Sequence, residues 1–207
     1  MYKNINRHIF ALLIAVTIFM LQGCSMAGLL REAGPSAKVT TGEVIIVGTI
    51  ELTPGLVKDE QKLDAEGVID LFGAGDMNKN RALIQLNSAT DAGGAAEYIN
   101  PVLGEPFAFV VPVNLKYVVE GYVVTEFTKH GYTGKIHLPV DFKLDIQPSD
   151  KAIYIGHIRY ERDDFNSITR VELKDDYVIA EKKFRKQYGS KYKLRKSLVQ
   201  QSQLASK

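Results

Sequence analysis

Apolar and polar residues alternate along much of the chain between residues 43 and 173. The clearest case is 135–147, where apolar side chains stand at every second position: Ile136, Leu138, Val140, Phe142, Leu144 and Ile146. Strict alternation is typical of a strand that buries one face. Segments rich in β-branched and aromatic residues predict further strands at 43–52, 81–87, 107–113, 116–128, 152–161 and 168–173. Pro139 indicates that its strand lies at a sheet edge or is bulged there, and Gly156 indicates a second bulge.

The period of the pattern changes after residue 174. Asp175 and Asp176 are candidate N-cap residues, and Gly189 stands where a helix between them would end. The apolar residues of 194–199 suggest a second short helix. Spacings of three and four place one set of side chains on a single face of the first helix: Tyr177, Ala180, Phe184 and Tyr188.

Short strands separated by glycine and proline turns, followed by one helix, predict a mainly β protein. We expect an antiparallel β-sandwich of the immunoglobulin-like kind, with about seven strands and a C-terminal helix. The sandwich domain should span 43–174, and the C-terminal helix and basic tail should span 175–207. The segments 56–80 and 88–101 are rich in glycine and polar residues, and we expect them to be irregular.

The first residues have the three zones of a secretory signal peptide. Lys3 and Arg7 give a positive start, 9–21 is apolar except for Thr17, and Gly23 is a small residue before a cleavage point. The apolar run is about 13 residues long, whereas a helix that spans a membrane needs roughly 20. The pattern therefore favours a segment that is removed during export.

Cys24 is the single cysteine of the chain, and it follows Leu21, Gln22 and Gly23. This tetrapeptide resembles the lipobox of bacterial lipoproteins. The resemblance implies that 1–23 is a lipoprotein signal peptide, and that the new amino-terminal Cys24 carries S-diacylglycerol and N-palmitoyl groups. Residues 24–42 would then be a lipidated tether, and Ser25 after the cysteine implies attachment to the outer membrane, facing the periplasm. The alternative is an ordinary secreted protein with a thiol near its cleavage site.

The charges are unevenly distributed along the chain. The full sequence carries +2, and loss of Lys3 and Arg7 would leave a neutral chain. Residues 24–174 have 15 basic and 21 acidic side chains, whereas 175–207 has 9 basic and 3 acidic ones. The basic residues that gather in the tail are candidates for contact with an anionic partner: Lys182, Lys183, Arg185, Lys186, Lys191, Lys193, Arg195 and Lys196. An exported protein would meet anionic lipid, lipopolysaccharide or an acidic envelope protein rather than nucleic acid. The alternative is a helix that leaves its lysines in water.

The sequence contains no motif that specifies catalysis, a metal or a cofactor. HExxH, CxxC and GxSxG patterns are missing, and Gly73-Ala74-Gly75 lacks the lysine of a phosphate-binding loop. The acidic residues of 59–76 are too loosely spaced for a calcium loop. Three histidines remain after export, and pairing of two strands would be needed to bring the second and third together: His130, His137 and His157. We therefore predict no catalytic residues, no metal and no cofactor.

Taken as a whole, these observations predict a non-enzymatic, lipid-anchored envelope lipoprotein that binds or scaffolds another envelope component. One alternative is an accessory subunit of an envelope secretion or transport assembly, which would use an exposed sheet edge or the charged tail. Another is an envelope hydrolase whose site is assembled from loops. A ligand site inside a hollow sandwich and one on its surface are both compatible with the sequence.

Overall fold

The computed structural model describes residues 28–58, 60, 80–88, 96–127 and 132–201. The predicted signal peptide, Cys24, His130, the glycine pair at 73–75 and nearly all of the acidic segment 59–76 lie outside these residues.

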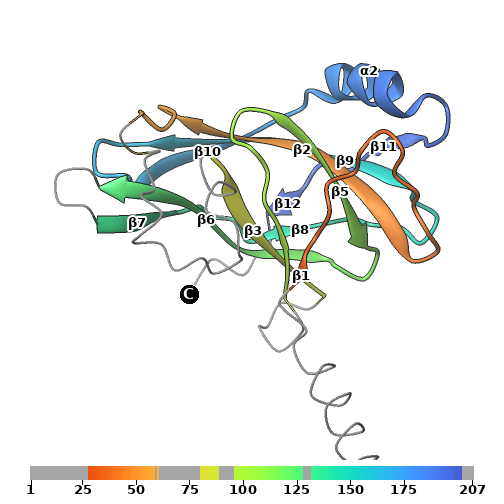
Figure 1. Ribbon diagram of the computed structural model, residues 1–207, viewed down its shortest axis with the longest axis horizontal. Helices are drawn as coiled ribbons and strands as arrows, with labels where there is room; N and C mark the ends of the chain where they lie inside the picture. The colour runs from red at the N-terminus through yellow and green to blue at the C-terminus, as the bar shows by residue number, and fades with distance from the viewer. Residues whose placement is uncertain (1–27, 59, 61–79, 89–95, 128–131, 202–207) are drawn as a thin grey trace, which may run out of the picture.

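The described residues form two β-sheets with one helix outside them (Figure 1). The first long strands are β2 (Glu43–Thr53), β3 (Ala82–Asn87), β5 (Pro106–Pro112) and β6 (Tyr117–Phe127). The later ones are β7 (Tyr132–His137), β9 (Ala152–Arg162) and β10 (Ile168–Lys174), and helix α2 is Tyr177–Tyr188. The short strands are β1 (Gly28–Leu29), β4 (Glu97–Ile99), β8 (Phe142–Lys143), β11 (Leu194–Lys196) and β12 (Gln200–Gln201).

Both sheets mix parallel and antiparallel pairs. Sheet A has the order β1-β4-β3-β6-β8-β12, with β7 also on β6, and sheet B has the order β10-β9-β2-β5, with β11 also on β9. β2 and β11 run parallel to β9, and β1 runs parallel to β4. The mainly β class and the C-terminal helix are thus confirmed, whereas an antiparallel, immunoglobulin-like arrangement is not. The physical reason is that alternation shows which face a residue occupies but carries no signal about which strand lies beside it.

The main core lies between the two sheets, and β2 shows how alternation builds it. Val44 and Ile46 are fully buried against sheet A, whereas Ile45 and Val47 point to the opposite face of sheet B. A bulge in β9 at Gly156, whose φ is +115°, keeps both halves of that strand in phase with β2. Burial of each such aliphatic side chain stabilises the fold by about 1.5–3 kcal/mol. The core is solid within the described residues, since its cavity measures only about 20 Å³.

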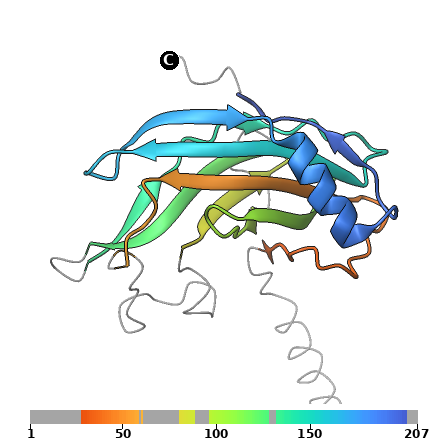
Figure 2. The same ribbon diagram turned by 90° about the horizontal axis from the view of Figure 1, so that it is seen from above.

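Helix α2 covers the outer face of sheet B (Figure 2). Phe184 and Tyr188 are buried there, with Tyr177 and Ala180 packed beside them, so the predicted helical face is confirmed. Gly189 ends the helix at a φ of +62°, and its N–H donates to the carbonyl of Arg185 at 2.8 Å. The helix is therefore a third layer of the fold. No helix among the described residues is long and apolar enough to cross a membrane.

Three local predictions differ from the structure. The segment 194–199 forms β11 and then continues along β9, because Leu194 and Val199 are buried at a sheet edge; the predicted second helix is wrong. The segment 88–101 contains β4, which has three residues and no clear pattern. The alternating burial of 135–147 is confirmed, but strand β7 ends at His137, two residues before Pro139, and only Phe142–Lys143 of the remainder forms a strand, β8.

The chain from Gly28 onward is attached to the domain. The N–H of Leu30 donates to Tyr98 of β4 at 2.7 Å, and the N–H of Ala33 donates to the carbonyl of Ala108 in β5 at 2.8 Å. Ala33 is buried. This stretch thus joins the edge of sheet A to the edge of sheet B. The described part of the predicted tether, 28–42, belongs to the folded domain.

Candidate functional site

A concave surface brings together half of the basic residues predicted from the tail. This basic hollow has a volume of about 450 Å³ and lies between the turn before β9 and the chain after α2. Tyr177 and Tyr192 contribute aromatic surface, and Asp150 is the one carboxylate in its lining. Five cationic side chains line it: Lys151, Lys191, Lys193, Arg195 and Lys196.

Three of these cations have no carboxylate partner. Lys191 Nζ donates to the backbone carbonyl of Ala37 at 2.7 Å, and Lys151 Nζ donates to that of Thr40 at 3.2 Å. Lys193 is exposed. Among the described residues none of the three forms an ion pair, so no carboxylate in this part of the chain contacts their charges directly.

The groups around Tyr192 favour a negative charge on its phenol oxygen. Burial opposes ionisation of its phenol, but a hydrogen bond with Lys191, another from the N–H of Val39, and the charges of Lys191 and Lys151 outweigh it. The pKa of Tyr192 is consequently below its ordinary value. A negatively charged oxygen is stabilised at this position by the same groups that would stabilise an anionic ligand.

Arg195 and Lys196 have a different role, because both are paired. Arg195 forms a two-bond contact with Asp150, at 2.8 Å and 2.7 Å, and a third contact with Asp145. Burial of Asp150 opposes its ionisation, but the bonds from Arg195 and from the N–H of Gln147 prevail and lower its pKa. Lys196 pairs with Asp175 at 2.8 Å. These two cations fix the wall of the basic hollow.

The other predicted cations lie on helix α2, outside the basic hollow. Arg185 pairs with Glu181 one turn away at 2.8 Å. Lys182, Lys183 and Lys186 are exposed on the helix. The eight predicted residues therefore do not form one cluster. Sequence reasoning missed Lys151, which is a single lysine far from the tail and has no spacing pattern to reveal it.

A second concave surface, the amphipathic groove, lies along the other side of α2. It measures about 460 Å³ and is bounded by Ile179, Lys183 and Gln187 on the helix, with Val47 and Ala108 as an apolar floor. At its end, His157 contacts Glu51 at 2.8 Å through Nε2 and Asp176 at 2.8 Å through Nδ1. Both contacts are hydrogen bonds only when both ring nitrogens carry protons.

The fold does not bring His137 and His157 together. His157 lies on the outer face of sheet B with both nitrogens occupied, and His137 is exposed on β7 of sheet A. Within the described part of the chain, no group of three His, Cys, Asp or Glu side chains is placed to hold a metal ion.

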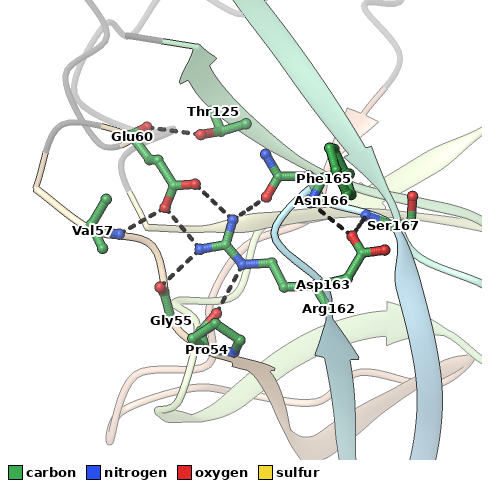
Figure 3. Close-up of polar contacts among 10 residues, drawn as sticks. All are labelled: Pro54, Gly55, Val57, Glu60, Thr125, Arg162, Asp163, Phe165, Asn166 and Ser167. Carbon is green, nitrogen blue, oxygen red and sulfur yellow. Dashed lines mark hydrogen bonds and ion pairs between the residues drawn. The ribbon is translucent and has the colours of Figure 1, made fainter.

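A third polar cluster surrounds Arg162 at the far end of β9 (Figure 3). Its Nε donates to Pro54, one terminal nitrogen donates to Glu60 and Asn166, and the other donates to Gly55 and Glu60. A guanidinium has five N–H bonds, and all five are used. The bonds from Arg162, followed by that from Val57, outweigh burial and lower the pKa of Glu60. Arg162 has no donor left for a ligand, so it ties the end of β9 to the neighbouring loops.

The described residues therefore form two packed mixed sheets with an external helix, and the concave surfaces are on the outside while the core holds only a very small cavity. Comparison of the chain with protein-family models, with curated proteins and with solved structures gives no match.

Proposed function

We propose that this protein is a lipid-anchored envelope lipoprotein that holds an anionic envelope component in the basic hollow, without catalysing a reaction. One observation carries the proposal: Lys151, Lys191 and Lys193 present cationic groups to a concave surface and none of them forms an ion pair among the described residues. The lipobox-like sequence at Cys24 supplies the anchor.

The chemistry of the basic hollow favours a ligand that carries phosphate groups. Lysine ammonium groups bind phosphate as compact point charges, and several of them on one concave surface suit a ligand with more than one negative oxygen. Tyr177 and Tyr192 would pack against the apolar part of such a ligand. An anionic phospholipid headgroup and the phosphorylated end of a lipopolysaccharide share this chemistry.

The position of the anchor supports action at the membrane surface. Cys24 precedes Gly28 of β1 by four positions, and four extended residues reach at most about 14 Å. A domain attached at Cys24 would therefore remain close to the headgroups. Each lysine near an anionic membrane surface contributes about 1 kcal/mol of attraction, and this attraction fades within about 8 Å at physiological salt.

The anchor is tested by metabolic labelling with a palmitate analogue. The full-length chain should incorporate the label and sediment with membranes, and the Cys24→Ser chain should lose the label. Labelling that persists in Cys24→Ser, or its absence in the parent, would refute the lipid anchor without bearing on the basic hollow.

The basic hollow is tested with residues 24–207 carrying Cys24→Ser, so that no lipid contributes. The protein should bind vesicles of anionic phosphatidylglycerol much more tightly than vesicles of zwitterionic phosphatidylcholine, and high salt should abolish this difference. Lys151→Ala/Lys193→Ala should weaken binding to the anionic vesicles on the order of tenfold.

The matched control is Lys182→Ala/Lys186→Ala, which removes the same charge from helix α2 outside the basic hollow. Equal losses in both double variants would show that only net charge matters and would overturn the site. Repeating the titration with purified lipopolysaccharide distinguishes the two phosphate sources, because the true ligand should bind more tightly at equal phosphate concentration.

A further inference from the structure

Strand β10 is an open edge of sheet B. It pairs with β9 on one side, and within the described residues its other side takes part in no strand pairing. An edge of this kind presents unpaired backbone N–H and C=O groups that a further strand can use. By contrast, the opposite edge of the sheet, β5, is covered by the chain at Arg31–Ala33.

The hairpin that contains β10 also exposes apolar surface. Val171 and Leu173 are 40% and 41% exposed, and Phe165 at the hairpin tip is 88% exposed. Val171 and Leu173 lie opposite Tyr160 and Ile158, two core residues, so they point to the inner side of the sheet. A strand added beside β10 would cover them and extend the core.

The charge pattern of β10 is self-complementary: two copies of the strand can face each other with opposite charges matched. Arg170 and Glu172 lie on the outer side of the sheet, opposite Glu161 and Arg159 of β9. If two copies of β10 run antiparallel about a two-fold axis at Val171, Arg170 of each copy stands opposite Glu172 of the other. Opposite charges at facing positions stabilise a strand pair, and like charges destabilise it.

Neighbouring registers are less favourable. A two-fold axis at Glu172 would place this residue opposite Glu172 of the other copy and Arg170 opposite Lys174. An axis at Arg170 would place the two copies of Arg170 opposite each other. An axis at Leu173 would pair Glu172 with Lys174 but would leave the first half of the strand unpaired. Val171 is also the midpoint of Ile168–Lys174, so this register uses the whole strand.

We infer that two copies of this chain associate through their β10 strands, antiparallel about Val171, and form one continuous sheet from their two copies of sheet B. The existing contacts of the two charged residues do not prevent this. Arg170 lies 3.7 Å from Glu161, and Glu172 lies 3.9 Å from Lys174, and both pairs are partly exposed. Exposed pairs at these distances exchange partners at little cost. The interface is isologous, because the same strand serves both copies.

The test places a cysteine at the proposed axis in the full-length chain, in its own membrane. Val171→Cys should form a disulfide-linked dimer under mild oxidation. The parent chain, whose single cysteine is Cys24, reports any link made through that residue. Lys182→Cys on helix α2 is the matched control, since it is exposed but distant from the edge, and it should not cross-link.

Charge reversal then tests the register. In the Val171→Cys background, Arg170→Glu or Glu172→Arg alone places like charges opposite each other and should lower the yield of dimer on the order of tenfold. Arg170→Glu combined with Glu172→Arg restores opposite charges and should restore the dimer. Circular dichroism of each variant verifies that the fold is retained.

Three results would overturn the inference: a Val171→Cys chain that does not cross-link, a cross-link to a different polypeptide, or a double reversal that fails to restore the dimer. None of these outcomes depends on what the basic hollow binds. A monomeric chain that still binds anionic vesicles would leave the proposed function intact.

Discussion

The Arg162 cluster and the basic hollow use the same kind of side chain in opposite ways. Arg162 is buried and gives all five N–H bonds to its own chain, with Glu60 as the balancing charge. Lys151 and Lys191 donate to backbone carbonyls, Lys191 also contacts the uncharged phenol of Tyr192, and Lys193 is exposed. The difference teaches that a count of cations does not identify a binding site. A candidate binding site is indicated instead by cations that form no ion pair with the described residues of the chain.

The strongest way to break this comparison is Arg162→Ala. The change removes the cation beside Glu60, which keeps only the N–H of Val57, and leaves two carbonyls without their donor at a site where the guanidinium side chain is 5% exposed. Loss of one partner from a buried ion pair costs about 3–5 kcal/mol of unfolding free energy. Urea denaturation measures this loss.

Arg185→Ala is the control for that change, because Arg185 also pairs with a glutamate but is 71% exposed. It should change stability by no more than about 0.5 kcal/mol. Similar losses of unfolding free energy for the two arginines would mean that burial and the complete use of its N–H donors do not make Arg162 more important for stability than Arg185.

Arg195→Ala should have an intermediate effect. Its side chain is 28% exposed, but it neutralises Asp150, whose side chain is only 7% exposed. The loss should be about 2 kcal/mol, since Asp150 keeps the hydrogen bond from Gln147. Asp150→Asn in the same background should cause little further loss, because the two residues act as a pair. Additive losses in the double variant would contradict the pairing.

Acid should weaken the Arg162 cluster through Glu60. Its folded-state pKa lies below the ordinary 4.5, so the carboxylate stabilises the fold above pH 4.5, and this contribution disappears as the pH falls through the lower folded value. Glu60→Gln should therefore lower the unfolding free energy by about 2 kcal/mol at pH 7 and by progressively less below pH 4.5. Urea titrations at pH 7 and pH 3 of both chains test this. A pH-independent cost would show that the charge of Glu60 is immaterial.

Lys193→Ala should have the smallest effect on stability. An exposed side chain without an ion pair contributes no more than about 0.5 kcal/mol. Binding to anionic vesicles should nevertheless weaken several-fold, which separates its role from that of Arg195. A thermal scan and a vesicle titration on the same sample measure both quantities. A large shift in melting temperature would place Lys193 with the structural cations.

Much of the fold was predictable because each strand and the helix carry their own periodicity. The face of α2 that bears Phe184 and Tyr188 and the alternation in β2 follow from local spacing. The partners of strands do not, since nothing within Glu43–Thr53 indicates that β9 is its parallel neighbour. β11 was missed because a three-residue strand at an edge is held by its neighbour and not by its own pattern.

The candidate site was only partly predictable for a related reason. Lys191 and Lys193 stand out in a basic segment, but whether a cation is free depends on acids that the fold brings from elsewhere. Arg195 is neutralised by Asp150, 45 positions away, and Lys151 joins the basic hollow from outside the tail. Such pairings require the tertiary structure.

The pairing of β2 with β9 also determines when the protein can fold. Glu51 of β2 reaches His157 of β9 across 106 positions, and β5 and β9 are the two neighbours of β2 in sheet B. Closing so long a loop is slow, and topologies dominated by distant contacts fold late. While the chain grows from its N-terminus, β2 has no β9 to pair with until about three quarters of the whole sequence has been synthesised. Sheet B can therefore close only after β9 has been synthesised, late in the growth of the chain.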